Sequence, residues 1–125
     1  MPMKEARTSN PLLQAPVVWP PIEGHIFETC ARTRTIRIDG ILFKFSSTKC
    51  RLIECILRSA VNREPFAPFE DLMQCFEHPE DDLRRSIYRH INAIRKTFLL
   101  FGLDIPSIRE QGYKLVSIAH DRLKR

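Results

Sequence analysis

The sequence predicts an α+β fold in which an antiparallel β element precedes three helices and a β-hairpin follows them. Three observations predict it. An Asp39-Gly40 pair separates two β-rich runs, an amphipathic helical pattern occupies residues 83–101, and two strand-like runs flank Gly112. Each run has the hydrophobic period of its element, about two residues for a strand and about 3.6 for a helix. The length of 125 residues and the 43% hydrophobic content suit one folded domain.

The composition and the spacing of the cysteines argue against a membrane protein and against a zinc site. The chain has no apolar run of the ~20 residues that a membrane span needs and no signal-peptide pattern, so we expect a soluble, cytoplasmic protein without a membrane partner. Four cysteines occur without CxxC spacing, and Cys75 with His78 supplies only half of a zinc site. The sequence therefore predicts no metal, no cofactor and buried, reduced thiols.

The N-terminal segment, residues 1–25, contains five of the nine prolines. Because proline removes backbone donors and fixes φ, we expect a flexible arm here, although the apolar patch at residues 17–19 offers a docking alternative. A domain over residues 26–118 and a basic tail over residues 119–125 complete the predicted organisation. Within the domain, Asp39-Gly40 between β-rich runs predicts an antiparallel hairpin.

Three helices are expected next. Ser46 and its neighbours offer N-cap oxygens for a first helix over residues 47–60. Pro68 is a plausible first-turn residue for a second helix that continues to Phe76. The acidic stretch at residues 77–82 is expected to be a loop whose aspartates cap the third helix.

The third helix has the clearest pattern. Ile87, Ile91 and Ile94 share one narrow stripe with Leu83 and Phe98, which must face a core. The opposite side carries Arg85, Arg89, Asn92 and Lys96, and no acid occurs from residue 83 to residue 103. Solvated helix surfaces normally mix both signs of charge, whereas arginine and asparagine pair with base edges in the DNA major groove. The pattern therefore favours DNA recognition over a merely solvated face.

A β-hairpin is expected after this helix. Gly102 should end the helix as a C′ residue, and residues 105–109 and 113–118 form two strand-like runs. Gly112 between them is expected to supply a backbone conformation that other residues resist. A basic helix followed by a hairpin is the arrangement of a winged helix-turn-helix, with the hairpin over residues 105–117 as the wing.

Two motifs carry a more specific resemblance. Residues 85–96 read Arg-Ser-Ile-Tyr-Arg-His-Ile-Asn-Ala-Ile-Arg-Lys, and residues 105–115 read Ile-Pro-Ser-Ile-Arg-Glu-Gln-Gly-Tyr-Lys-Leu. Over residues 30–117 the chain resembles the OmpR/PhoB-type winged-helix DNA-binding domain of bacterial response regulators. The first motif is similar to that family's recognition helix and the second to its wing. Leu52-Ile53 is similar to the start of the family's first helix.

The resemblance implies a sequence-specific double-stranded DNA-binding transcriptional regulator and a set of DNA contacts. Residues matching phosphate or groove-edge positions are Arg85, His90 and Arg95. Residues matching the surface that faces the major groove are Tyr88, Arg89, Asn92 and Lys96. Arg84, the first basic residue of the same helix, joins this set. Ser107 and Arg109 match the wing, and an arginine there is expected in the minor groove. Glu110 stands where the family usually has glycine.

Further partners follow from the same resemblance. RNA polymerase or another regulator, a tandem dimer on DNA and a nucleoid location are expectations of this kind. Residues 1–29 are too few for the family's receiver domain, which leaves open a separate binding domain or part of a longer chain. The alternative function is a protein-interaction adaptor that holds an acidic partner with the same basic helix. An enzyme is not expected, because no catalytic motif has the required spacing.

Overall fold

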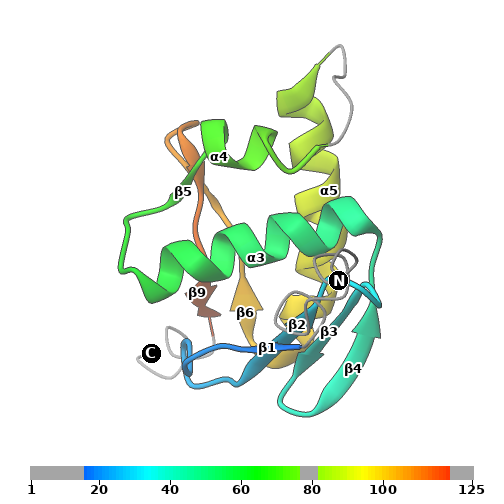
Figure 1. Ribbon diagram of the computed structural model, residues 1–125. Coiled ribbons are helices and arrows are strands. Elements are labelled where there is room, and N and C mark those ends of the chain that lie inside the picture. The colour runs from blue at the N-terminus through cyan, green and yellow to red at the C-terminus, as the bar shows by residue number, and fades with distance from the viewer. Residues whose placement is uncertain (1–15, 77–81, 119–125) are drawn as a thin grey trace, which may run out of the picture.

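A computed structural model describes residues 16–76 and 82–118. The fold is α+β, with a four-stranded antiparallel sheet, three helices and C-terminal hairpins. Figure 1 shows α3 crossing in front of α5, with α4 on one side of α3 and the sheet on the other. The expectations for residues 1–15, 77–81 and 119–125 lie outside the described residues.

The N-terminal sheet is built from consecutive strands in the order β1-β2-β3-β4. Its strands are β1 (Val17–Val18), β2 (Phe27–Cys30), β3 (Thr35–Ile38) and β4 (Ile41–Lys44). Asp39 and Gly40 join β3 to β4 with φ angles of 52° and 88°, so the predicted hairpin is confirmed. Both residues adopt the positive φ that a two-residue hairpin turn needs.

The sheet corrects the expected flexible arm for residues 16–25. Val17 and Val18 pair with Thr29 and Glu28 of β2, so the fold begins before residue 26. Trp19 donates from Nε1 to the Thr29 hydroxyl at 3.0 Å, and Ile22 is buried in the core. The prolines stop a long strand, but they do not prevent this short edge strand or the burial of Ile22 directly after Pro21.

Helix α3 (Ser47–Val61) and helix α4 (Phe69–Met73) follow the sheet. Ser46 caps α3, because its hydroxyl accepts a hydrogen bond from the Lys49 backbone N–H at 3.3 Å. Helix α4 is shorter than expected: Pro68 is its N-cap in extended conformation, and the chain leaves the helix after Met73. The predicted end at Phe76 is wrong because Gln74 and Cys75 form a turn and Phe76 has no regular secondary structure.

Helix α5 (Leu83–Phe98) continues as the 3₁₀-helix η1 (Leu99–Phe101). The helical segment therefore matches the predicted residues 83–101, with a tighter last turn. Asp82 caps α5 through Oδ1, which accepts from the Arg85 backbone N–H at 3.1 Å. Gly102 follows with φ 73° and ends the helix in the left-handed conformation that glycine favours.

Five two-residue strands complete the fold. They are β5 (Ala67–Pro68), β6 (Leu103–Asp104), β7 (Ser107–Ile108), β8 (Gly112–Tyr113) and β9 (Val116–Ser117). Strand β8 lies between β5 and β7, and β9 pairs with β6. The sequence predicts two strands, over residues 105–109 and 113–118. In the structure this segment forms three short strands: β7 and β8 share a sheet with β5, and β9 pairs with β6 in a second sheet.

One core joins these parts. The stripe of Ile87, Ile91, Ile94 and Phe98 is buried and packs with apolar residues of α3 and the N-terminal sheet. Phe27 of β2 lies against Phe98, with 5.8 Å between ring centroids. Since this stripe fixes the rotation of α5 about its axis, it also determines which side chains of α5 remain exposed.

Candidate nucleic-acid interface

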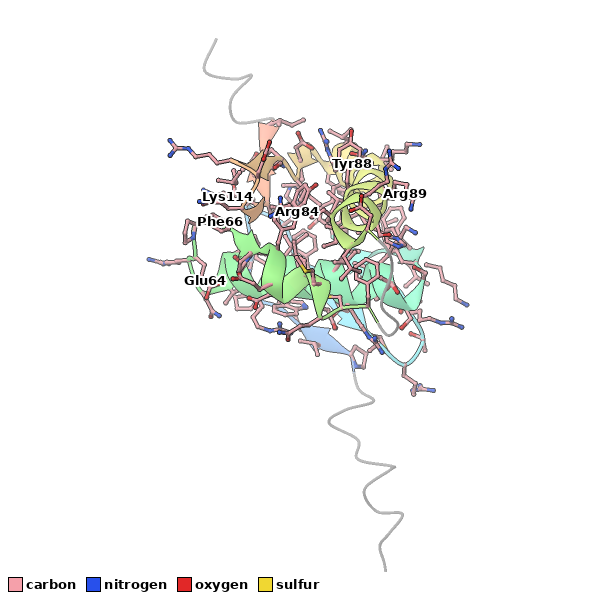
Figure 2. The ribbon with its side chains drawn as sticks, turned by 90° about the horizontal axis from the view of Figure 1, so that it is seen from above. Glu64, Phe66, Arg84, Tyr88, Arg89 and Lys114 are labelled. Carbon is pink, nitrogen blue, oxygen red and sulfur yellow. The ribbon has the colours of Figure 1, made fainter. Side chains whose placement is uncertain are left out.

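The face of α5 opposite the core carries the residues that the sequence predicts to face the DNA major groove. Arg85, Tyr88, Arg89 and Lys96 are exposed, and Asn92 is half-buried. In Figure 2, Tyr88 and Arg89 lie on the side of α5 that faces away from α3. The structure therefore brings these five predicted residues onto one helix surface, with the positive charges separated by one or two helical turns.

Arg84 lies at the junction between α5, α4 and the hairpin. Its guanidinium carbon lies 4.4 Å from the centroid of the Phe69 ring, and its Nη1 donates to the Glu110 carbonyl oxygen at 3.5 Å. Figure 2 places Arg84 between α5 and the hairpin. A cation over an aromatic face is attracted by the ring quadrupole, so this arginine helps to hold the hairpin against α5 as well as adding positive charge.

Arg95 is paired within the protein. Its Nε donates to Asp104 Oδ1 at 2.7 Å, its Nη2 donates to Asp104 Oδ2 at 3.3 Å, and its Nη1 donates to Asn92 Oδ1 at 3.3 Å. The carboxylate neutralises much of the arginine's charge, and the third bond orients the Asn92 amide. Sequence reasoning missed Asp104, although it is the first acid after the basic run.

His90 is half-buried on the side of α5 that faces the residues after α4. Its ring lies 5.5 Å from the Phe76 ring, centroid to centroid, at an interplanar angle of 58°. The histidine therefore packs on the chain that follows α4, and the structure does not place it on the exposed surface with Arg85 and Arg89. Its side chain can stabilise the approach of that segment to α5.

The hairpin presents Ser107 and Arg109 to solvent. Arg109 and Glu110 form the turn with φ angles of 47° and 60°, and the Gln111 N–H closes it on the Ile108 carbonyl at 2.7 Å. Positive φ strains residues other than glycine, so both side chains are held in an uncommon conformation. Glu110 directly follows Arg109, the arginine predicted to enter the minor groove, so the turn carries one carboxylate and one guanidinium at adjacent positions.

Gly112 has a different role from the one expected. It is absent from the residues with positive φ, and a Cβ atom built on it would lie 2.0 Å from the Ala67 carbonyl oxygen. Glycine is therefore required because β5 approaches β8 closely at this position. The sequence signal was correct in marking glycine as necessary, but the local pattern could not reveal the distant strand that makes it so.

Tyr113 connects the hairpin to the helices. Its ring meets the Phe69 ring edge-to-face at a centroid distance of 5.8 Å. Burial raises the pKa of Tyr113, and the nearby Tyr88 raises it further. The Arg84 contact with the Glu110 carbonyl likewise joins α5 to the hairpin.

Among residues 16–76 and 82–118, no three His, Cys, Asp or Glu side chains are grouped as a metal site would need. No helix within those same ranges is both long enough and apolar enough to cross a bilayer.

Comparison with known proteins finds no matching family model, no matching curated protein and no matching solved structure.

Proposed function

We propose that this chain is a sequence-specific double-stranded DNA-binding transcriptional regulator with a winged helix-turn-helix fold. The observation that carries the proposal is the exposed face of α5, which bears Arg85, Arg89 and Lys96, lacks acidic residues and lies opposite a fully buried apolar stripe. A major groove admits one α-helix, and a duplex presents both phosphates and base edges to it.

The order of elements supports the winged-helix interpretation. A sheet and three helices precede the β7–β8 hairpin, which shares a three-stranded sheet with β5. The Arg84–Glu110 contact joins that hairpin to α5. We therefore assign α5 to the major groove and the wing at residues 105–117 to the adjacent minor groove or backbone.

Within this proposal, the contacts of each side chain define its role. Arg85, Arg89 and Lys96 are exposed and contact phosphates or bases, which supplies affinity through counterion release. Asn92 directs its oxygen toward Arg95, leaving its amide hydrogens to donate to a base. Arg95 and Arg84 act mainly as positioning residues, because both bond to other residues of the protein. Arg109 contacts the DNA as part of the wing.

Tyr88 adds a large exposed ring to the same face, with 55% of its surface accessible. A phenol can donate to a phosphate oxygen or pack against a thymine methyl group. Tandem binding of two copies on one duplex, contact with RNA polymerase and a cytoplasmic, nucleoid-associated location belong to this proposal as consequences of the family resemblance.

The test is enrichment of binding sites from random duplexes at near-physiological salt, followed by titration of the selected duplex. The Arg89→Ala/Asn92→Ala variant should lose preference for the selected sequence and retain salt-dependent binding, because phosphate contacts by other basic residues remain. Lys44→Ala is the matched control, since Lys44 is an exposed cation on β4, an element outside both α5 and the wing. Failure of the unaltered chain to bind any duplex at low salt contradicts the proposal.

The alternative is a protein-interaction adaptor that binds an acidic partner through α5. Glu110 favours it, because an exposed carboxylate at the wing turn opposes a close approach to a minor groove. The two functions differ at Arg109. Arg109→Ala should weaken binding to the selected duplex under the first proposal, whereas binding of an acidic protein to α5 should not require this side chain.

A further inference from the structure

A cleft of about 340 Å³ lies between α3 and the turn after α4, away from the exposed face of α5. Cys55 and Cys75 both line it, together with Arg51 and Arg58 of α3. Each cysteine residue keeps 8% of its surface exposed. The two sulfur atoms are therefore shielded from bulky reagents, but a molecule of the size of water or peroxide can reach them through the cleft.

The two thiols come from different elements and meet in this cleft. Cys55 belongs to α3, and Cys75 follows α4, so residues that are 20 positions apart in the sequence are brought together by the packing of the two helices. The two side chains interact strongly enough to shift the pKa of both thiols, downward for Cys75 and upward for Cys55. The Cys75 thiol also donates to the Asp71 carbonyl at 3.7 Å, and Arg51 Nη1 donates to the Cys75 carbonyl at 3.4 Å.

These contacts make the two thiols unequal. The hydrogen bond with Cys55 lowers the pKa of Cys75, and Arg51 and Arg58 lower it further, whereas burial and the charge of Asp71 raise it. The same hydrogen bond and burial raise the pKa of Cys55. For comparison, burial raises the pKa of Cys50 on the same helix to about 11. Because the thiolate is the nucleophile, Cys75 is the one of these two thiols that reacts first.

We propose that Cys55 and Cys75 form a peroxide-reactive dithiol site, at which a small hydroperoxide converts the two thiols to a disulfide. The Cys75 thiolate attacks one peroxide oxygen, the O–O bond breaks, and the departing hydroxide takes a proton and leaves as water. Cys75 is then a sulfenic acid. The Cys55 sulfur attacks it, the S–O bond breaks, and a second water leaves with the Cys55 proton. The dithiol loses two electrons, and hydrogen peroxide is reduced to two molecules of water.

The packing favours an intramolecular disulfide over other products. A second thiol that lines the same cleft captures the sulfenic acid before a second peroxide molecule can oxidise it further. The same enclosure disfavours a disulfide between two copies of the chain, since both residues are 8% exposed.

The test treats the reduced full chain with hydrogen peroxide at pH 7, alkylates the remaining thiols and maps the peptides by mass spectrometry. The expected product is a Cys55–Cys75 disulfide within one chain that dithiothreitol reverses. The proposal is overturned if Cys55 and Cys75 stay reduced while Cys30 or Cys50 is consumed, or if the disulfide joins another pair. This mapping uses the unaltered chain and does not depend on how any variant folds.

Three variants assign the roles of the two sulfurs, each checked for folding by circular dichroism. Cys75→Ala should slow peroxide consumption by about tenfold or more, because it removes the thiol whose pKa is lowered and which supplies the nucleophilic thiolate. Cys55→Ala should leave Cys75 as a sulfenic acid that a 1,3-diketone reagent traps. Cys50→Ala is the matched control on α3 and should leave the rate and the disulfide unchanged. Equal rates for Cys75→Ala and the unaltered chain would contradict the assignment of Cys75 as the nucleophile.

Discussion

Arg95 of α5 and Asp104 of β6 form a two-point ion pair, with 2.7 Å between Nε and Oδ1 and 3.3 Å between Nη2 and Oδ2. The pair ties the basic helix to the strand that begins directly after Gly102. Two parallel hydrogen bonds give it a defined geometry, which an arginine–carboxylate pair can supply and a lysine cannot.

We expect this pair to contribute to stability. In a double-mutant cycle of Arg95→Gln and Asp104→Asn, the coupling free energy should be about 0.5–1 kcal/mol, because Arg95 is 36% exposed and solvent screens part of the attraction. Urea unfolding of the four proteins measures it. A coupling of zero would mean that the contact does not persist in solution.

Gly112→Ala should destabilise the protein by about 3 kcal/mol, near the upper end for overpacking, because the added Cβ meets the Ala67 carbonyl oxygen at 2.0 Å. Gly40→Ala is the matched control. A Cβ there meets nothing within 4 Å, and its φ of 88° alone should cost about 1 kcal/mol. Thermal unfolding distinguishes the two changes, and an equal loss of stability would contradict the close approach of β5 to β8.

Two substitutions of Glu110 separate strain from charge. Glu110→Gly should stabilise the protein by about 0.5–1 kcal/mol, because glycine adopts the φ of 60° without strain. Glu110→Gln should leave stability nearly unchanged, since it keeps a side chain in that conformation. Both remove the negative charge beside Arg109, so both should tighten DNA binding to a similar extent. If only the glycine variant binds more tightly, turn strain rather than charge limits the wing.

Asp39 makes part of the folding free energy dependent on pH. The hydrogen bond from the Ile26 N–H lowers the pKa of Asp39, and the His25 side chain, 2.6 Å from Oδ2, lowers it further. A carboxyl whose pKa falls on folding stabilises the protein above its unfolded pKa, near 3.8, and loses that contribution as pH falls through the folded value. Urea midpoints from pH 6 to pH 2.5 should therefore fall less steeply for Asp39→Asn, a residue that tolerates positive φ. Parallel pH profiles would contradict the role of Asp39.

The sequence predicts most of the local structure. The hairpin at Asp39-Gly40, the caps at Ser46 and Asp82 and the stop at Gly102 each depend on a few neighbouring residues, and the structure has all four. The exposed face of α5 follows equally directly, because its buried stripe determines the opposite side.

Long-range contacts account for what the sequence did not reveal. The pairing of Arg95 with Asp104, the packing of His90 on Phe76 and the contact of Arg84 with Glu110 give three of the predicted DNA-contacting side chains partners within the protein. The strand at Val17 was missed for the same reason, because its partner Thr29 lies in β2 and the local proline content argued against a strand.

The pairing of Ala67 with Tyr113 also has a consequence for how the protein is made. The chain between these two residues contains all of α4 and α5, so the ladder cannot form until nearly the whole domain has left the ribosome. Closing so large a loop costs entropy before any contact repays it. The N-terminal sheet, by contrast, pairs consecutive strands and can form early. A nascent chain thus completes the pairing of β5 with β8 late, and a chain that ends before residue 112 lacks it.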